Sequence, residues 1–360
     1  VGTAILELCR ALSAEDRGCD FSVLAAWPGM FDDCAGRPGW TVVPCDGARG
    51  GTLRKAWFLQ VRVPQLVRRL GGDLLHSLQF LAPLGGGVPL VTSVYDLAWL
   101  EHPDTVERSR RLYYRLVVPG SLGRSRAILA ASRATADELA RNFPHLADRI
   151  RVTPLGVPRW ARDAGPRQAE PGDGGYFLFL GALEPRKNLV RVLDAYARVL
   201  EGRGPDKTPD LVLAGPEGWR DGAIRDRLEG LGGSGKVRTP GYCQPREMST
   251  LFKEALALVF PSIHEGFGLP ILEAMAQGVP VLTSDRGAMA EIAGQAALLV
   301  DPENTAALAG ALGRLVDEPG LRRDLSAAGI DRVRAYAWAT TAQATVEAYR
   351  SVLEGQGLRF

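Results

Sequence analysis

The sequence predicts an α/β protein with two doubly wound domains, each a parallel sheet with helices on both faces. Short apolar, β-rich runs alternate with helical runs from end to end, which is the rhythm of βαβ units. A stretch rich in Pro, Gly and charge at 158–175 breaks this rhythm, and the alternation restarts afterwards. With 360 residues the chain is long enough for two cores. We expect one domain over 1–158, a second over 159–337, and a terminal helical segment over 338–360.

The first half opens on a helix rather than a strand. Ile5, Leu6, Cys9 and Leu12 fall on one face of a helix over 2–12. Because an α/β domain should begin with a strand, we expect that the chain as given lacks its native N-terminus. Further strands are expected at 21–25, 40–43, 74–76, 90–94, 127–130 and 150–152, and helices at 52–69, 105–117 and 134–142.

The second half repeats the alternation. Strands are expected at 176–180, 211–214, 237–239, 257–260, 281–283 and 297–299. Helices are expected at 188–203, 222–231, 245–254, 269–277, 289–293, 304–317 and 319–330. A last helix over 338–354 has no strand left to follow it.

The composition excludes several classes of protein. The net charge of +2 is too small to imply nucleic-acid binding. The five cysteines form no C-x-x-C pair, which fits reduced thiols and a cytoplasmic protein. No apolar run reaches the length of a membrane span. Two basic stretches, around Arg62 and Arg115, are either solvated helix faces or contacts to anionic lipid.

The segment HEGFGLPILEAMAQGVPVLTS is the most informative one. It follows an apolar run, so we interpret it as strand, tight loop and helix. Gly266 and Gly268 let the backbone approach a ligand closely, and Pro270 suits the first turn of a helix. The loop amides and the helix N-terminus form a site for a negative group such as a diphosphate. Glu265 lies in this loop, and Glu273 lies about one turn into the helix.

The segment LGALEPRKN also follows a strand and opens a helix. Arg186 and Lys187 therefore project at a helix N-terminus, where two fixed cations can neutralise a departing diphosphate without a metal. Taken alone, the two residues are better explained as solvated surface residues. No D-x-D triplet for a metal-bound diphosphate occurs in the sequence.

The segment VYDLAWLEH follows another apolar strand. Tyr95 and Asp96 should lie at the carboxyl end of that strand, where ligands of α/β proteins bind. Tyr95 can donate a hydrogen bond to a sugar hydroxyl, but it cannot act as a base near neutral pH without a large pKa shift.

The string E-G-F-G-L-P-x-L-E, followed by A-x-x-x-G-x-P-V, resembles the signature of glycosyltransferase family 4. The resemblance covers nearly the whole chain. It implies the GT-B fold, with two Rossmann-like domains facing across a cleft and a C-terminal helix that crosses back to the first domain. It also implies a retaining, metal-independent transferase that uses a nucleoside-diphosphate sugar. In this family a strand and a glycine loop precede the first helix, so Gly2 would be the last residue of that loop.

The resemblance also implies roles for individual residues. Glu265 would stabilise the transferred sugar, and Arg186 and Lys187 the leaving diphosphate; Glu273 would hold the ribose. The remaining donor contacts would be Gly266, Phe267, Gly268, Leu269, Gly215, Gly241 and Tyr242. Gly2, Tyr95 and Asp96 would lie on the acceptor or sugar side. Two positions depart from the family: Tyr95 replaces a usual His, and Ala182 replaces a frequent Arg.

The segment G-x-L-E-P-R-K-N with a G-W turn is similar to bacterial mannosyltransferases of polysaccharide assembly. We therefore expect GDP-mannose as donor, with UDP- and dTDP-sugars left open, and neither a cofactor nor a metal. The acceptor would be a sugar, a glycolipid or a small molecule. The protein would be cytoplasmic, with peripheral contact at the inner face of the membrane left open. No nucleic-acid partner is expected.

Two alternative functions remain. One is a GT-B epimerase or phosphorylase, and the other is a non-catalytic sugar-nucleotide-binding protein, suggested by Tyr95 and Ala182. A P-loop is excluded at GLGGSGKV, because Val237 offers no hydroxyl for magnesium and the segment comes after a helix. His264 begins H-E-x-x-G rather than the zinc motif H-E-x-x-H, and no G-x-G-x-x-G follows a strand.

Overall fold

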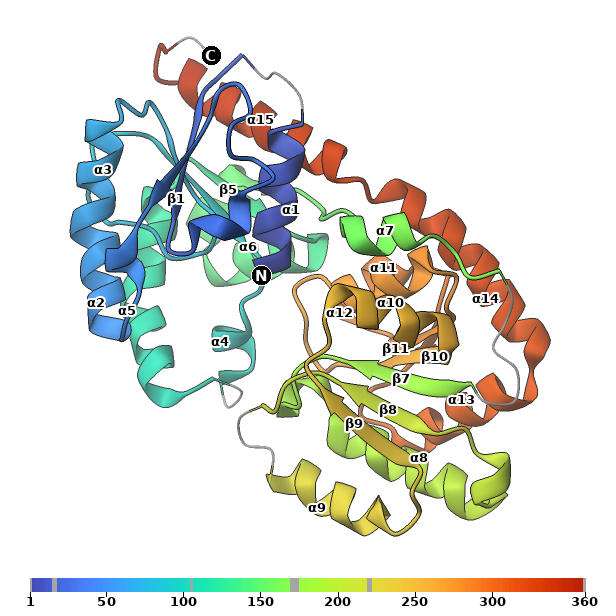
Figure 1. Ribbon diagram of the computed structural model, residues 1–360. Coiled ribbons are helices and arrows are strands. Elements are labelled where there is room, and N and C mark those ends of the chain that lie inside the picture. The colour runs from blue at the N-terminus through green and yellow to red at the C-terminus, as the bar shows by residue number, and fades with distance from the viewer. Residues whose placement is uncertain (1, 15–17, 104–105, 169–174, 219–221, 359–360) are drawn as a thin grey trace. The chain divides into compact units, whose positions relative to one another are not determined.

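The computed structural model describes residues 2–14, 18–103, 106–168, 175–218 and 222–358 (Figure 1). The chain forms two compact units. Unit 1 comprises residues 1–156 together with 337–360, and unit 2 comprises residues 157–336. The C-terminal segment therefore belongs to the same unit as the N-terminal half of the chain.

Unit 1 contains only parallel strand pairs in its described part. Four strands form a sheet in the order β3-β4-β5-β6, and two more form the pair β1-β2. Their bounds are β1 Phe21–Ala25, β2 Trp40–Pro44, β3 Leu75–Ser77, β4 Leu90–Val94, β5 Ala127–Ala130 and β6 Ile150–Val152. Every residue of β4 and β5 is buried, as expected for strands that helices cover on both faces.

The helices of unit 1 include one from each end of the chain. Their bounds are α1 Gly2–Leu12, α2 Thr52–Trp57, α3 Val63–Arg69, α4 Ala98–Glu101, α5 Arg108–Arg124, α6 Arg133–Asn142 and α15 Trp338–Glu354. The terminal helix α15 packs against α1 and β5 (Figure 1). Its Thr341 hydroxyl donates to the Pro154 carbonyl at 2.6 Å, and its Tyr349 hydroxyl lies 2.6 Å from His76 Nδ1.

Unit 2 is built on a six-stranded parallel sheet in the order β12-β11-β10-β7-β8-β9. The strands are β7 Tyr176–Leu180, β8 Leu211–Ala214, β9 Val237–Gly241, β10 Ala255–Phe260, β11 Val281–Ser284 and β12 Leu298–Val300. The helices are α7 Arg159–Ala164, α8 Leu189–Arg203, α9 Gly222–Gly232, α10 Pro245–Glu254, α11 Leu269–Ala276, α12 Gly287–Ala293, α13 Thr305–Asp317 and α14 Pro319–Arg332.

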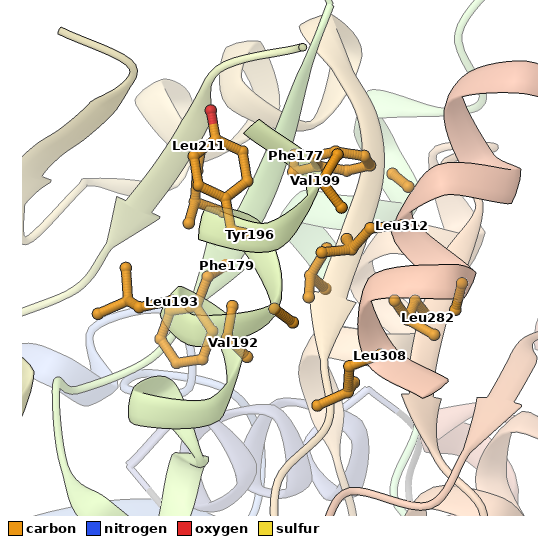
Figure 2. Packing of buried hydrophobic residues seen from close by; sticks show 14 of the residues in the cluster. Phe177, Phe179, Val192, Leu193, Tyr196, Val199, Leu211, Leu282, Leu308 and Leu312 are labelled. Carbon is orange, nitrogen blue, oxygen red and sulfur yellow. The ribbon is translucent and has the colours of Figure 1, made fainter. Parts of the chain in front are cut away.

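The core of unit 2 lies between the sheet and the helices α8 and α13. Figure 2 shows Val192, Leu193 and Tyr196 of α8 packing near Phe177 and Phe179 of β7, with side chains of α13 beside them. These α8 positions fall at helical spacing on one face, which explains why the segment folds as a helix on this sheet. The Tyr196 hydroxyl still donates to the Pro209 carbonyl at 2.8 Å, so its burial leaves no unsatisfied donor.

The expected α/β architecture is confirmed, but several element boundaries were wrong. Helix α5 runs past Pro119 to Arg124 instead of ending at 117, because burial of Val118 and Leu122 on its last turns outweighs the hydrogen bond lost at proline. The expected start of that helix at 105 lies outside the described residues. The expected linker at 158–175 contains the helix α7.

The expected helix over 52–69 is interrupted by a π-helical turn, Phe58–Arg62, between α2 and α3. The extra residue in this turn rotates the helix face, so that Phe58, Val63 and Val67 are all buried. No helix in the described part of the chain is long and apolar enough to cross a membrane.

Candidate active site in unit 2

The two segments singled out in the second half of the sequence meet at one edge of the sheet. Strands β7 and β10 are parallel neighbours, so the loops that follow them lie side by side at their carboxyl ends. The first loop leads through a short 3-10 turn, Pro185–Lys187, into α8, and the second leads into α11. The backbone ties them together: the Ile263 amide donates to the Arg186 carbonyl at 3.0 Å.

Asn188 holds these two loops together, although no local feature of the sequence marks it as a site residue. It has a positive φ of 63°, and no other described residue except glycine does; Asn tolerates this left-handed conformation better than most residues. Its side-chain amide donates to the carbonyls of Pro261 at 3.0 Å and Pro302 at 2.6 Å. Asn188 is buried, so it fixes the position of the two cations that precede it.

Arg186 and Lys187 converge on one carboxylate, that of Glu265. Arg186 Nη1 donates to Glu265 Oε2 at 2.8 Å, and Lys187 Nζ donates to Oε1 at 2.5 Å. Arg186 is further held by the His264 carbonyl at 2.8 Å and by Glu184 Oε1 at 2.9 Å. Lys187 Nζ also lies 4.8 Å from the centre of the Phe260 ring, a cation–π contact.

The side chains of this cluster are mostly buried but keep some exposure to solvent. The exposed side-chain fractions are 18% for Arg186, 11% for Lys187 and 12% for Glu265. Solvated surface side chains would be far more exposed, so the alternative that the two cations are plain surface residues is wrong. Burial alone would raise the pKa of Glu265, but the charges of Lys187 and Arg186 lower it to about 2. Glu265 is therefore an anion at every physiological pH.

Glu273 lies in α11, eight residues further on, and has the opposite electrostatic character. Burial raises the pKa of its carboxyl group to about 7, and the charge of Lys187 offsets only part of this rise. Within the described part of the chain, the Glu273 carboxylate has no hydrogen-bond partner. A buried, unpartnered carboxyl group that titrates near neutrality is typical of a functional position.

The loop between these carboxylates has the expected backbone geometry. Gly268 has a φ of 99° at the N-cap of α11, a conformation that favours glycine, and Pro270 lies in the first turn. The ring of Phe267 is buried and lies edge-on to Tyr336, with ring centres 6.0 Å apart. Any contact of Phe267 with a donor is therefore a backbone contact. Gly266 precedes Phe267 in the loop, and Leu269 is the first residue of α11.

Gly215 directly follows β8, beside the loop that carries the cations. A Cβ at Gly215 would lie 2.0 Å from the Gly181 carbonyl oxygen, so only glycine fits. Its amide donates to the Gly241 carbonyl at 2.8 Å, which connects the ends of β8 and β9. Tyr242 follows and is 68% exposed. Gly215 thus has a structural reason for being glycine, and a donor contact there remains a prediction.

Three predicted site residues belong to unit 1. Gly2 begins α1 and is exposed, with open space where a side chain would lie. Tyr95 and Asp96 follow β4 at its carboxyl end. Burial raises the pKa of Tyr95, with further contributions from neighbouring side chains, so its hydroxyl stays protonated and can act as a donor. Asp96 Oδ1 accepts from the Ala98 amide at 3.0 Å, which stabilises the start of α4.

The comparisons with known protein families cover both units. The model described as Glycosyltransferase Family 4 matches residues 1–159, and the model described as Glycosyl transferases group 1 matches residues 163–332. The O-antigen chain mannosyltransferase B of Escherichia coli is 31% identical over 267 residues, which span 72% of this chain and 70% of the relative. A D-inositol 3-phosphate glycosyltransferase of Paenarthrobacter aurescens is 29% identical over 321 residues, or 82% of this chain and 76% of the relative.

Solved structures agree in fold. Sucrose-phosphate synthase from Thermosynechococcus elongatus superposes with a TM-score of 0.73 at 22% identity, over 97% of this chain and 92% of the other. Anabaena HepE in complex with UDP-glucose gives a TM-score of 0.74 at 18% identity, over 97% and 96%. Fold and family models together define a glycosyltransferase with the GT-B fold. The chain belongs to glycosyltransferase family 4.

Proposed function

We propose that this glycosyltransferase moves a hexose from a nucleoside-diphosphate sugar to an acceptor hydroxyl, with retention of configuration at the anomeric carbon. The observation that supports it best is the pair of cations held against Glu265 beside the N-terminus of α11, with Glu273 unpartnered in the same helix. A donor supplies the matching groups: an anionic diphosphate for the cations and ribose hydroxyls for the carboxylate.

In this proposal Arg186, Lys187 and the amides of residues 266–269 stabilise the negative charge that develops on the leaving diphosphate. Arg186 and Lys187 already have Glu265 as counter-ion, so their geometry is fixed before the donor arrives. Glu265 remains ionised and stabilises the positive charge that builds up at the anomeric carbon. The leaving phosphate oxygen accepts the proton of the acceptor hydroxyl, which would make a separate protein base unnecessary.

The proposed donor is GDP-mannose, and UDP- and dTDP-sugars are the alternatives. The E. coli relative is named a mannosyltransferase, whereas a structural neighbour holds UDP-glucose. A thermal-shift panel of GDP-, UDP-, dTDP- and ADP-sugars distinguishes them. We expect the largest shift with GDP-mannose, and a larger shift with another nucleotide would replace this choice of donor.

We propose that catalysis needs no metal, because Arg186, Lys187 and the loop amides together offer hydrogen-bond donors to the diphosphate. Activity should persist in EDTA and should not rise by more than about twofold when Mg²⁺ is added; a strict Mg²⁺ requirement would contradict the proposed role of Arg186 and Lys187.

A non-catalytic sugar-nucleotide binder is the second candidate, and the protonated Tyr95 in place of a histidine favours it. Donor hydrolysis separates the two functions. An enzyme slowly releases nucleoside diphosphate from its donor, and this release should fall at least about tenfold in Lys187→Ala. Donor binding without any release of nucleoside diphosphate would favour the binder.

We further propose a cytoplasmic protein that contacts the inner face of the membrane through α5, in the assembly of a polysaccharide, glycolipid or glycoconjugate. All five cysteines are free thiols. Leu112 and Leu116, one helical turn apart, are 61% and 71% exposed, and exposed Arg108 and Arg115 lie in the same helix, a combination typical of interfacial helices. Replacing both leucines by serine should reduce sedimentation with phosphatidylglycerol vesicles; unchanged sedimentation would argue against this contact.

A further inference from the structure

A groove runs over the amino ends of β4, β5 and β6 in unit 1, the edge of the sheet opposite to Tyr95 and Asp96. Two cavities of about 400 Å³ and 430 Å³ make it up, and both are lined by Arg126 and Gln356. The first extends to the turn over 86–90, and the second extends along the last turns of α15. The function proposed above does not use this amino-edge groove.

The charged side chains that line this groove are mostly positive. Arg124, Arg126, Arg149 and Arg151 line it, and Glu347 is the carboxylate among its lining residues. Within the described residues, none of these four arginines forms an ion pair. Other arginines of the chain do find carboxylates, as Arg227 does with Asp194 and Arg314 with Glu318. Four cations without counter-ions raise the local potential and favour an anionic ligand.

Two of the guanidinium groups are fixed in a way that leaves donors available. Arg149 Nη1 donates to the carbonyls of Gly123 at 2.9 Å and Ser125 at 3.0 Å. Arg151 Nη1 donates to the carbonyls of Asp148 at 2.7 Å and Ile150 at 3.0 Å. Among the described residues, Nε and Nη2 of both groups have no partner. A guanidinium held by one nitrogen can use the others for two-pronged contact with phosphate oxygens.

A glycine run forms the wall opposite these arginines. The segment Gly85–Gly87 leads into β4, and Gly86 has a φ of 138°. A Cβ at Gly86 would lie 3.0 Å from Arg124 Nη2, so glycine keeps the wall close to this cation. Arg124 itself holds the wall by donating to the carbonyls of Pro83, Gly86 and Val88. The amides of Gly86 and Gly87 have no partner within the described chain, and such amides beside cations are typical of anion sites.

We propose that the amino-edge groove binds a phosphate-bearing anion, at a site distinct from the cation pair of unit 2. A soluble phosphate ester and the headgroup of an anionic phospholipid share this chemistry. The groove borders exposed apolar surface, because Leu84, next to Pro83, is 48% exposed and packs close to Gly120 of α5. Because of this neighbouring apolar surface, the test includes phospholipid vesicles as well as a soluble phosphate compound.

The test compares the wild-type protein with the double variant Arg126→Gln/Arg151→Gln. Both side chains are exposed, and among the described residues the Arg126 side chain makes no hydrogen bond; only its backbone amide does, to the Leu90 carbonyl. The variant should therefore fold. Arg323→Gln in α14 is the single-charge control, because that side chain is also exposed but lies in unit 2. One arm titrates inorganic tripolyphosphate by calorimetry, and the other measures sedimentation with vesicles of phosphatidylglycerol against phosphatidylcholine.

For a soluble ester we expect tripolyphosphate binding at the groove to weaken at least about tenfold in the double variant, since each charge-assisted contact contributes about a tenfold change. Tripolyphosphate should also protect Arg149 from phenylglyoxal in a mass-spectrometric map of the wild-type protein. This residue-resolved readout separates the groove from any binding at Arg186. For a lipid headgroup we expect the double variant to lose binding to phosphatidylglycerol vesicles, with tripolyphosphate binding unchanged.

Equal binding of both probes by the wild-type protein, the double variant and Arg323→Gln would overturn the proposal. Protection of Arg186 alone, with no protection of the groove arginines and no lipid effect, would overturn it as well.

Discussion

Glu265 and Glu273 are chemically identical and eight residues apart, yet their surroundings shift their pKa values in opposite directions. Glu265 meets two cations, so its pKa is about 2, whereas Glu273 is buried without a hydrogen-bond partner, so its pKa is about 7. The segment between them places one carboxylate in a loop and the other in a helix. This difference yields a stability test that does not depend on the acceptor.

We expect Glu273→Gln to stabilise the protein at pH 8 but not at pH 5. The folded state keeps this proton up to about pH 7, while the unfolded chain releases it near pH 4.5, so stability is lost as pH rises between these values. A neutral glutamine removes that loss, and the expected gain at pH 8 is on the order of 1–3 kcal/mol. Urea unfolding at both pH values measures it. The same variant should bind the donor more weakly, as expected when a functional site costs stability.

Glu265→Gln is the matched control with the opposite sign. The folded pKa lies below the unfolded one, so this carboxylate stabilises the protein above about pH 4.5, and the stabilisation is lost as pH falls towards 2. Removing its charge leaves Arg186 and Lys187 without their shared partner, so we expect a loss of roughly 3 kcal/mol at pH 8. Equal effects of the two variants at pH 8 would contradict the opposite pKa shifts assigned to Glu265 and Glu273.

The four residues Arg186, Lys187, Glu265 and Glu273 could be predicted because each lies in a recognisable segment that follows a strand. It could not show that Arg186 and Lys187 converge on Glu265, because that contact joins two loops about 80 residues apart. Asn188 was not predicted for a similar reason, because its role depends on distant carbonyl groups at residues 261 and 302. From the sequence alone, an Asn before a helix indicates only an ordinary N-cap.

At the scale of elements, local patterns predicted which segments form helices and strands better than where they end. Pro119 reads as a helix stop, but buried side chains on both sides keep α5 helical. Similarly, no local signal marks the π turn before α3, since it serves the packing of Phe58 and Val63. Tertiary packing overrides propensity at these points, and such packing is not visible in a single sequence.

The start of α15 gives a prediction at this scale. A Cβ at Gly156 would lie 2.3 Å from the Trp338 amide nitrogen and 2.7 Å from its ring, and the Trp338 side chain is buried. Gly156→Ala should therefore displace α15 and lower stability by about 1–3 kcal/mol, measured as a fall in Tm. Gly202→Ala in α8 is the control, because nothing lies within 4 Å of its Cβ position. That change should stabilise slightly, and equal effects would contradict the proposed clash.

At the scale of the whole molecule, the order of elements along the chain was enough to predict two α/β units built on parallel strands, although it did not show that β1 and β2 pair apart from the four-stranded sheet of unit 1. That the C-terminal helix α15 joins unit 1 is less visible in the sequence, because no local pattern specifies the unit against which a helix packs. In the structure, α15 adds Tyr349 to a buried network in which His76 Nε2 lies 2.9 Å from the Ser93 hydroxyl. Burial lowers the pKa of His76 to about 3, so this network stays neutral at physiological pH.

Because each unit has its own hydrophobic core, we expect two unfolding transitions in calorimetry. Gly156→Ala should lower only the transition of unit 1, and Leu193→Ala, which opens a cavity in the core of unit 2, should lower only the other. Every residue proposed to grip the nucleotide lies in unit 2. The donor at 100 times its Kd should therefore stabilise the transition sensitive to Leu193→Ala by about 2.7 kcal/mol, with little effect on the other. If the donor instead raised the transition sensitive to Gly156→Ala, the nucleotide would bind unit 1, and the roles proposed for Arg186, Lys187 and Glu273 would be wrong.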